Sequence, residues 1–453
     1  MTRINSAAVI VLVAFALRVA YDLVCYSLLG PAGLMGPDSA AFLLNAQYLS
    51  DGGSLMTVAD NGKSGFALDL MPISLLLMAA TLTPGQPADP IGYVLVQAGM
   101  DAVTCLLIGR LAEFLEPRLF VPAALLAAVN PTQIVVAGLV YTDTPFLFFC
   151  CLGLVLFLEW QRTGALAMAV LSGLAWGGAL MTRQFIQYWL FLLPVLGMLA
   201  AASSRPSVRD LFRRACHLAV MGGLIIAFAA PIALRNMDQF GSPRLSAQSG
   251  SHFLFWVVPL VREFNDGTPR SDSKARGDML FQTWQGEPPP VNPFDSSDRM
   301  MEIAKQELLD LGPGAVVAAW VKGAALNLVA PASTISPLVS SLPHDGFYAT
   351  AGDGLGQKIW NFLVHNSGKT FVLILVVSGI GMPIWLGLGI TGFVRAIRRP
   401  EFACVVLFLW VGFVLALNGP VVSPKYRLPL EPAWIAFAAL GWNTVRHRVR
   451  VGL

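Results

Sequence analysis

Long apolar runs separated by short polar connections dominate the pattern of the chain. A helix needs about 20 mainly apolar residues to cross a bilayer, and a helix satisfies its own backbone hydrogen bonds there. We therefore predict an all-α polytopic membrane protein with about 11–12 transmembrane helices. The predicted spans lie near residues 7–29, 68–83, 91–109, 119–137, 145–160, 165–182, 184–202, 215–234, 371–394, 401–418 and 428–445.

Two polar regions interrupt this pattern. The first, 30–67, is rich in glycine and has a helical pattern around 39–50. The second follows the span that ends near Leu234, and it holds the amphipathic stretch SSDRMMEIAKQELLDLG (296–312). We predict a helix there that is capped by Ser297 or Asp298 and stopped by Gly312-Pro313. The predicted division is an N-terminal transmembrane module with the first outer loop, a long outer loop with short amphipathic helices, and a C-terminal set of helices: 1–235, 236–370 and 371–453.

Arginine clusters predict the orientation. Basic residues favour the cytoplasmic side, which places three clusters inside and the long loop outside. The clusters are Arg205, Arg209, Arg213 and Arg214; Arg395, Arg398 and Arg399; and Arg446, Arg448 and Arg450. An odd number of full spans would then put loop 30–67 inside as well. The segment 68–83, which is short and interrupted by Pro72, is the best candidate for one that does not cross, and 314–332 is a candidate extra crossing.

Composition agrees with a membrane protein. The 453-residue chain is 55% hydrophobic and 13% charged, whereas a soluble domain carries about 25% charged residues. The net charge of +3 gives no indication of nucleic-acid binding. The apolar segment Ala7–Leu29 is long for a signal peptide, and we read it as a retained span. All six cysteines lie in or beside apolar segments, which argues against a disulfide framework and a cysteine-bound metal.

Two acids lie at predicted helix starts. Asp38, in GPDSAAF, directly precedes a helical pattern, so it can be a helix cap, a catalytic base or both. Asp143, in TDTP, suits the start of the next helix in the same way. Capping alone explains TDTP well. The functional alternative is a second carboxylate at the same membrane face that binds substrate or an ion.

Basic residues at the outer ends of separate spans form a second group of candidates. They are Arg183, Arg235, Lys425 and Arg427, with Lys63 as a further member. Such side chains often extend to lipid headgroups. Their convergence favours instead a site for an anionic group such as phosphate. His252 lies in the long outer loop, where a lone histidine is usually only solvated. No metal-binding spacing such as HExxH occurs, and nucleotide-binding signatures are absent.

Five short stretches, in this order, resemble membrane glycosyltransferases of the GT-C superfamily. GPDSAAFLLNAQYL resembles their first outer loop, and LVYTDTPFLFF their second acidic motif. LMTRQF resembles their TR element, and RNMDQFGSPRLSAQSG the start of their long outer loop. PKYRLPLEP resembles a stretch near their C-terminal end. The chain is most similar to bacterial protein O-mannosyltransferase-like and aminoarabinose-transferase-like members.

The resemblance implies a GT-C type bundle and a polyprenyl-phosphate sugar donor. It implies inverting transfer to an acceptor hydroxyl on a lipid or glycan, with Asp38 as general base and Asp143 as second acid. The residues it suggests for the donor phosphate or sugar are Lys63, Arg183, Arg235, Lys425, Tyr426 and Arg427. His252 is a candidate contact of the acceptor. No cofactor is assigned, and a divalent metal ion stays open.

The resemblance also implies a location and leaves alternatives. The expected location is the bacterial inner membrane, with the site on the periplasmic face. Protein mannosyltransferases carry an Asp-Glu pair where this chain has Asp38 and Ser39, which argues against a protein acceptor. The main alternative is a transporter or flippase of a lipid-linked glycan, which predicts ionisable residues deep within spans. A glycan polymerase or ligase with a different bundle is a third reading.

Overall fold

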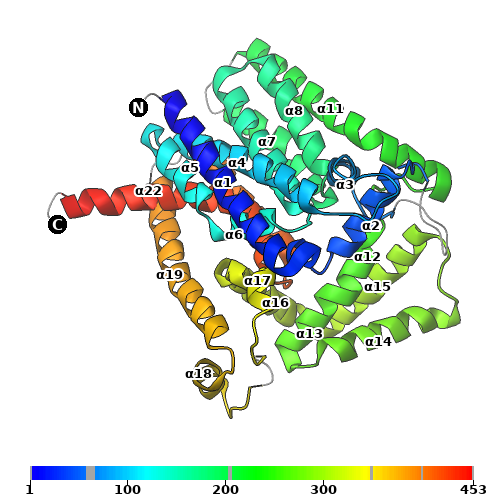
Figure 1. Cartoon of the computed structure of the whole chain (residues 1–453). Helices are drawn as coiled ribbons and strands as arrows, with labels where there is room; N and C mark the ends of the chain where they lie inside the picture. The colour runs from blue at the N-terminus through cyan, green and yellow to red at the C-terminus, as the bar shows by residue number, and fades with distance from the viewer. Residues whose placement is uncertain (1–2, 58–66, 203–206, 347–349, 399–400, 451–453) are drawn as a thin grey trace.

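A computed structural model describes residues 3–57, 67–202, 207–346, 350–398 and 401–450. Throughout these ranges the regular structure is helical (Figure 1). Among the described residues, six segments are long and apolar enough to cross a membrane. They contain α1 (Arg3–Leu29), α4 (Ile91–Glu113), α7 (Asp143–Thr163), α9 with α10 (Gln187–Leu190, Leu192–Ala202), α11 (Val208–Phe240) and α19 (Lys369–Ile397).

Shorter and broken helices complete the bundle. Helix α5 (Phe120–Ala128) is followed by α6 (Pro131–Ala137) after a bend of 52°, the geometry of a broken span or of a re-entrant loop. The apolar helices α8 (Leu166–Leu180) and α20 (Phe402–Asn418) pack beside the long ones, and α22 (Glu431–Arg450) closes the chain. The all-helical membrane architecture predicted from the apolar runs is confirmed.

Polar contacts define the two ends of the bundle. At one end, Arg395 pairs with Glu116 at 3.0 Å and bonds Thr444 at 2.9 Å, while Arg214 bonds Gln161 at 2.9 Å. We call this the arginine-rich end. At the opposite end, Val140 N–H donates to Leu34 at 2.9 Å, which joins the loop after α1 to the start of α7.

Helix α3 (Pro72–Ala79) resolves the conflict over orientation. Its eight residues span about 12 Å, whereas the hydrocarbon core is about 30 Å thick. Ile73 N–H bonds the Met181 carbonyl at 3.0 Å, and Gly85 N–H after the helix bonds Asp51 at 2.8 Å. Both flanks of α3 therefore lie at the opposite end, and α3 does not cross. The described part of the first loop, 30–57, therefore lies at the opposite end of the bundle from Arg214 and Arg395.

The core shows how the helices approach one another. Trp176, Trp189 and Trp410 are fully buried, and the Trp410 ring lies 6.1 Å from that of Trp176 and 5.0 Å from that of Trp189. Helices α19 and α22 cross closely: a Cβ at Gly392 would lie 1.7 Å from the Phe437 carbonyl oxygen. Small residues permit such close backbone contact between membrane helices. Any larger residue at position 392 would force the two helices apart.

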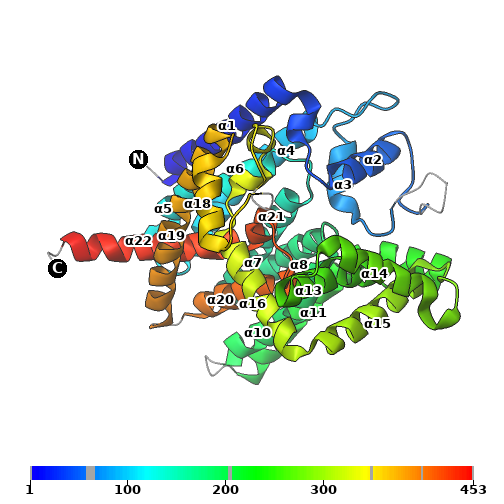
Figure 2. The same cartoon turned by 90° about the horizontal axis from the view of Figure 1, so that it is seen from below.

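The long outer loop follows α11 and forms a layer of short helices, whereas α2 (Ser39–Ser50) packs against α3. Figures 1 and 2 show α12–α15 on the side of the molecule away from the C-terminal end of α22. The helices of the long outer loop are α12 (Gln248–His252), α13 (Val258–Asp266), α14 (Arg270–Thr283), α15 (Pro293–Leu311), α16 (Pro313–Val329), α17 (Pro337–Ser340) and α18 (Leu355–His365). Helix α21 (Pro424–Arg427) lies between α20 and α22.

The amphipathic helix predicted at 296–312 exists as α15, with one correction. Its cap is Asn292, whose side chain accepts from Phe294 N–H at 2.9 Å, and neither Ser297 nor Asp298 caps it. The helix starts earlier because Pro293 suits its first position. It ends at Gly312 as predicted. Helix α16 turns by 102° from α15, and its Trp320 donates to the carbonyl of Ala416, near the C-terminal end of α20, at 3.0 Å.

Candidate active site

Asp38 occupies the cap position of α2 but does not cap it. Helix α2 begins at Ser39, and no hydrogen bond joins the Asp38 carboxylate to its first turn. The Asp38 Oδ2 atom instead contacts Lys425 Nζ. Ser39 holds the turn, because its hydroxyl accepts from Gly36 N–H and donates to the Val140 carbonyl, both at 2.8 Å. The expectation that one carboxylate both caps the helix and faces the site is thus corrected.

Lys425 is a mostly buried cation in contact with an exposed carboxylate. Its side chain is 12% exposed, whereas that of Asp38 is 50% exposed. The ammonium lies 4.8 Å from the ring centre of Tyr141 and 5.3 Å from that of Tyr426. Such cation–π contacts hold an ammonium group without neutralising it. The ammonium of Lys425 is therefore held by two aromatic rings next to a carboxylate that reaches solvent.

Asp143 and Arg183 form a second acid–cation pair. Asp143 is the first residue of α7, is 3% exposed and contacts Arg183 Nη1. Its carboxylate makes no cap bond, although an acid in the first turn is favoured by the helix dipole. Arg183 follows α8, is 22% exposed and lies 5.6 Å from the Phe185 ring centre. The buried carboxylate of Asp143 thus holds the guanidinium group of Arg183, which is partly exposed to solvent.

Tyr141 lies between the two pairs. Burial and the nearby carboxylates of Asp38 and Asp143 raise the pKa of the Tyr141 hydroxyl well above its ordinary value. A Cβ at position 36 would lie 1.9 Å from this hydroxyl, so only glycine fits against it. The Tyr93 hydroxyl donates to the Tyr141 carbonyl at 2.8 Å and fixes the turn before α7. Sequence reasoning missed Tyr141, because an aromatic residue between apolar runs carries no distinctive signal.

His252 lies near Arg183, whereas Arg235 contacts the loop after α2. Burial and the nearby Arg183 lower the pKa of His252, which keeps the ring neutral at neutral pH. Arg235 donates to the Leu55 carbonyl at 2.6 Å and to Asn236 Oδ1 at 2.9 Å, so it holds the loop after α2. Lys63 lies outside the described residues.

Arg427 belongs to the core instead of the open site. It is 3% exposed and pairs with Glu431, which is 0% exposed, at 2.7 Å. It also donates to the Ala330 carbonyl at 2.9 Å and to the Thr132 hydroxyl. These partners occupy the guanidinium group and hold it within the core. Tyr426 stays beside Lys425, where its ring contacts the ammonium.

A buried polar cluster inside the bundle was also unexpected. Arg18 on α1 pairs with Asp101 on α4 at 2.5 Å, and both side chains are at most 1% exposed. Arg18 also donates to the carbonyls of Ala14 and Ala128. Asp22 is 0% exposed, and neither of its carboxylate oxygens has a hydrogen-bond partner among the described residues.

The site draws on both transmembrane parts of the chain. Asp38, Asp143 and Arg183 come from the N-terminal part, and Lys425 from the C-terminal part. Within the described ranges, no group of three or more histidine, cysteine, aspartate or glutamate side chains is arranged to hold a metal ion. The described arrangement offers two carboxylates, two cations and a neutral imidazole, which suits a reaction at a phosphorylated centre.

Comparison with solved structures places this architecture. No protein-family model and no curated protein matches the sequence. The archaeal oligosaccharyltransferase AglB from Archaeoglobus fulgidus, in complex with an inhibitory peptide and a dolichol-phosphate, aligns with a TM-score of 0.55 and 14% identity over 99% of this chain and 51% of that chain. Its apo form gives a TM-score of 0.52 and 14% identity over 98% of this chain and 51% of that chain.

A bacterial structure is similar at a lower level. ArnT from Cupriavidus metallidurans, bound to undecaprenyl phosphate, gives a TM-score of 0.36 and 16% identity over 96% of this chain and 78% of that chain. The fold assignment rests on AglB, of which this chain spans about half the length. The chain has the fold of the oligosaccharyltransferase AglB, in agreement with the helical membrane bundle that the five sequence stretches predicted.

Proposed function

We propose that the chain is a glycosyltransferase that moves a sugar from a polyprenyl-phosphate donor to an acceptor hydroxyl at the outer membrane face. One observation carries the proposal: the pairs Asp38–Lys425 and Asp143–Arg183 converge on Tyr141 at the end of the bundle away from the arginine clusters. The fold supports the class of reaction, and the AglB structure of the same fold holds a dolichol-phosphate.

Asp38 is the proposed general base. Its side chain is half exposed, and Oδ1 has no hydrogen-bond partner among the described residues, so this oxygen is available to accept a proton. A positioned base contributes on the order of 10²–10⁴ to the rate of such a transfer. The buried Asp143 does not suit this role, because 3% exposure leaves no room for an acceptor hydroxyl. Asp143 is instead proposed as a positioning residue for Arg183.

Lys425 and Arg183 are the proposed partners of the departing phosphate. In the proposed step, the acceptor oxygen bonds to the anomeric carbon while the bond from that carbon to the phosphate oxygen breaks. The hydroxyl proton passes to Asp38, and the bonding electron pair leaves with the polyprenyl phosphate. Cations fixed in place stabilise the charge that develops on the leaving oxygen. A single displacement from the opposite face inverts the anomeric centre.

His252 is proposed to contact the acceptor. Its neutral ring lies close enough to Arg183 for that cation to lower its pKa, so it can share a hydrogen bond without adding charge. A lipid or glycan hydroxyl is the proposed acceptor class. The outer face is proposed because the arginine clusters at the other end favour the cytoplasm, which in a bacterium makes the site periplasmic.

The test is transfer by purified protein from a polyprenyl-phosphate sugar. Asp38→Asn is expected to bind the donor and to lose transfer by on the order of 10²–10⁴-fold. Asp51→Asn is the matched control, because Asp51 follows the same helix and bonds only Gln47 and Gly85 among the described residues. Full activity of Asp38→Asn, with donor binding intact, would refute the role of Asp38 as base.

The transporter reading receives support from the buried cluster Arg18, Asp22 and Asp101, since ionisable residues within spans often mark a transport path. Two features favour a structural role for most of it: Arg18 is engaged by Asp101 and by backbone carbonyls, and the cluster is fully buried. Reconstituted vesicles that carry a labelled lipid-linked sugar separate the two functions. Movement of the lipid between leaflets without sugar transfer would favour the transporter.

A further inference from the structure

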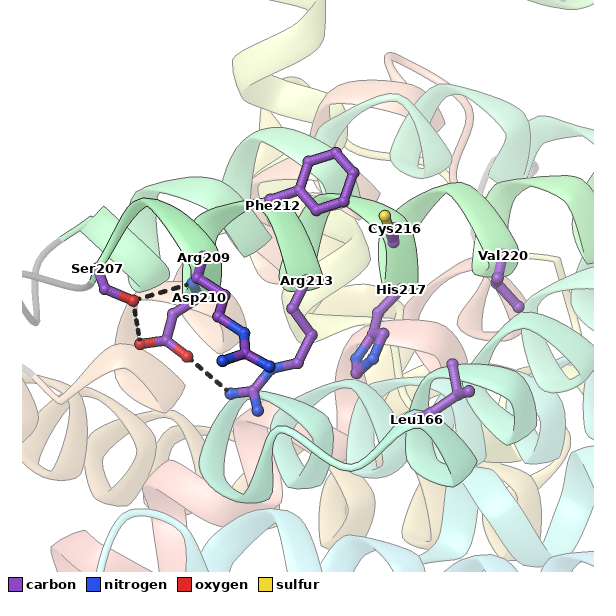
Figure 3. A pocket seen from close by; sticks show the side chains of 9 residues that line it. All are labelled: Leu166, Ser207, Arg209, Asp210, Phe212, Arg213, Cys216, His217 and Val220. Atoms are coloured by element: carbon purple, nitrogen blue, oxygen red, sulfur yellow. Dashed lines mark hydrogen bonds and ion pairs between the residues drawn. The ribbon is translucent and has the colours of Figure 1, made fainter.

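A basic cavity lies at the arginine-rich end, remote from the proposed active site. It has a volume of about 720 Å³ and is formed mainly by one side of α11 (Figure 3). Its lining residues are Leu166, Ser207, Arg209, Asp210, Phe212, Arg213, Cys216, His217 and Val220. Neither the proposed transfer reaction nor the fold assigns it a role.

The charge of the cavity wall is positive. Arg209 and Arg213 lie one helical turn apart, and Figure 3 shows their guanidinium groups close together. Asp210 pairs with Arg213 at 3.1 Å. No ion pair of Arg209 occurs among the residues that the structure describes. One carboxylate against two guanidinium groups leaves an excess of positive charge, and guanidinium groups bind phosphate with two parallel hydrogen bonds.

His217 adds a fixed neutral donor to the cavity. Its side chain is only 9% exposed and lines the cavity beside Arg213. The indole N–H of Trp160 donates to His217 Nδ1 at 3.1 Å. A neutral imidazole that accepts at Nδ1 carries its proton on Nε2. The Nε2–H group has no partner among the described residues and is available to a ligand oxygen.

The length of α11 places these groups at the level of lipid headgroups. Between Arg214 and Arg235 the helix carries no Asp, Glu, Lys or Arg, and this stretch spans roughly 30 Å at 1.5 Å per residue. A hydrocarbon core has about the same thickness. Arg209 and Arg213 therefore lie just beyond the core. Exposed apolar side chains accompany them, because Phe212 is 71% and Leu166 48% exposed.

We propose that this cavity binds the phosphate headgroup of an anionic membrane lipid. Arg209 and Arg213 pair with the phosphate, and His217 Nε2 donates to one of its oxygens. Phe212 and Leu166 contact the acyl chains. The combination of cations, a buried neutral donor and apolar flanks fits an amphiphile better than a free anion. The site is independent of the proposed transfer reaction at the other end of the bundle.

The experiment measures lipid retained by the full-length protein in detergent micelles. Native mass spectrometry counts bound phosphatidylglycerol, with phosphatidylcholine as the zwitterionic reference. Wild-type protein is expected to retain phosphatidylglycerol preferentially. The variant Arg209→Gln/Arg213→Gln is expected to lose this preference by about tenfold, since two charge-assisted contacts disappear. If the double variant does not elute as a single folded species, Arg209→Gln alone is used, because it breaks no described ion pair.

Arg162→Gln is the matched control. Arg162 is an exposed arginine in the last turn of α7 that does not line the cavity. The Arg162→Gln variant should retain as much phosphatidylglycerol as the wild-type protein does. Three results would overturn the proposal. The double variant could retain as much phosphatidylglycerol as wild type, or Arg162→Gln could lose as much of it as the double variant does. Millimolar inorganic phosphate could also displace the lipid. The second result would mean unspecific attraction by the arginine-rich end, and the third a site for free phosphate.

Discussion

Lys425 and Arg427 are two residues apart in one short helix, yet they serve different regions of the molecule. Lys425 contacts an acid that is 50% exposed, whereas Arg427 contacts one that is 0% exposed. The ammonium of Lys425 is held by aromatic rings, while the guanidinium of Arg427 is occupied by Glu431, carbonyls and a hydroxyl. The contrast shows that a cation close to the site can take part in the reaction only if the carboxylate it contacts is exposed to solvent.

The largest expected effect is on stability at the buried pair. Arg427→Gln leaves Glu431 charged and without its cation, which should cost about 3–5 kcal/mol of unfolding free energy. Thermal unfolding of the purified protein measures the loss. Glu431→Gln should behave similarly. An unchanged melting midpoint in both variants would show that the pair is not what holds α21 in place.

Lys425→Gln should have the opposite profile. The partner carboxylate is half exposed, so the unfolding free energy should change by no more than about 1 kcal/mol. Transfer should fall by about 10²-fold or more, because one cation at the departing phosphate is removed. Paired melting and transfer assays measure both quantities. A variant that melts early and transfers normally would reverse the comparison between Lys425 and Arg427.

Gly36→Ala tests the turn that joins the two acid–cation pairs. The new methyl group would overlap the Tyr141 hydroxyl, which should cost about 1–3 kcal/mol and reduce transfer. Adding Tyr141→Phe removes the hydroxyl and should restore part of the stability. Gly52→Ala, at a position with no neighbour within 4 Å but a positive φ of 90°, reports backbone strain alone. Equal melting of Gly36→Ala and wild type would contradict the close contact.

The smallest expected effect concerns pH. The pKa of His252 is lower in the folded protein than in the unfolded chain, so the unfolded chain binds more protons as the pH falls. This residue should therefore lower stability below about pH 6.5, the ordinary pKa of histidine, and have no effect above it. His252→Gln should flatten the fall in melting midpoint between neutral and acidic pH. A steeper fall in the variant would mean that His252 is charged in the folded state.

The fold and part of the site could be predicted from sequence. Apolar run length fixes most spans, and the order of Asp38, Asp143, Arg183 and Lys425 anticipated residues that the structure brings to one end. The separation of Lys425 from Arg427 could not be predicted. Successive helix positions turn by about 100°, so two residues on one turn face different surroundings, and only tertiary contacts decide which is buried.

The ion pair between Arg18 and Asp101 could not be predicted from sequence for a related reason. Arg18 and Asp101 are 83 residues apart, and each lies within an apolar run. Nothing local to either run indicates that the two side chains meet. The helix cap of α15 shows the opposite case: the local signal at Ser297 and Asp298 was plausible, but Asn292 begins the helix because Pro293 follows it.

Helix α3 determines which surfaces of the protein share a compartment. If residues 68–83 formed a complete span, every later loop would lie on the other side of the membrane. Asp38 and Asp143 would then be separated by the full thickness of the bilayer and could never share a substrate. An insertion that lengthened α3 is therefore a change of topology, however small it looks in an alignment, and it would abolish the site without altering any residue of it.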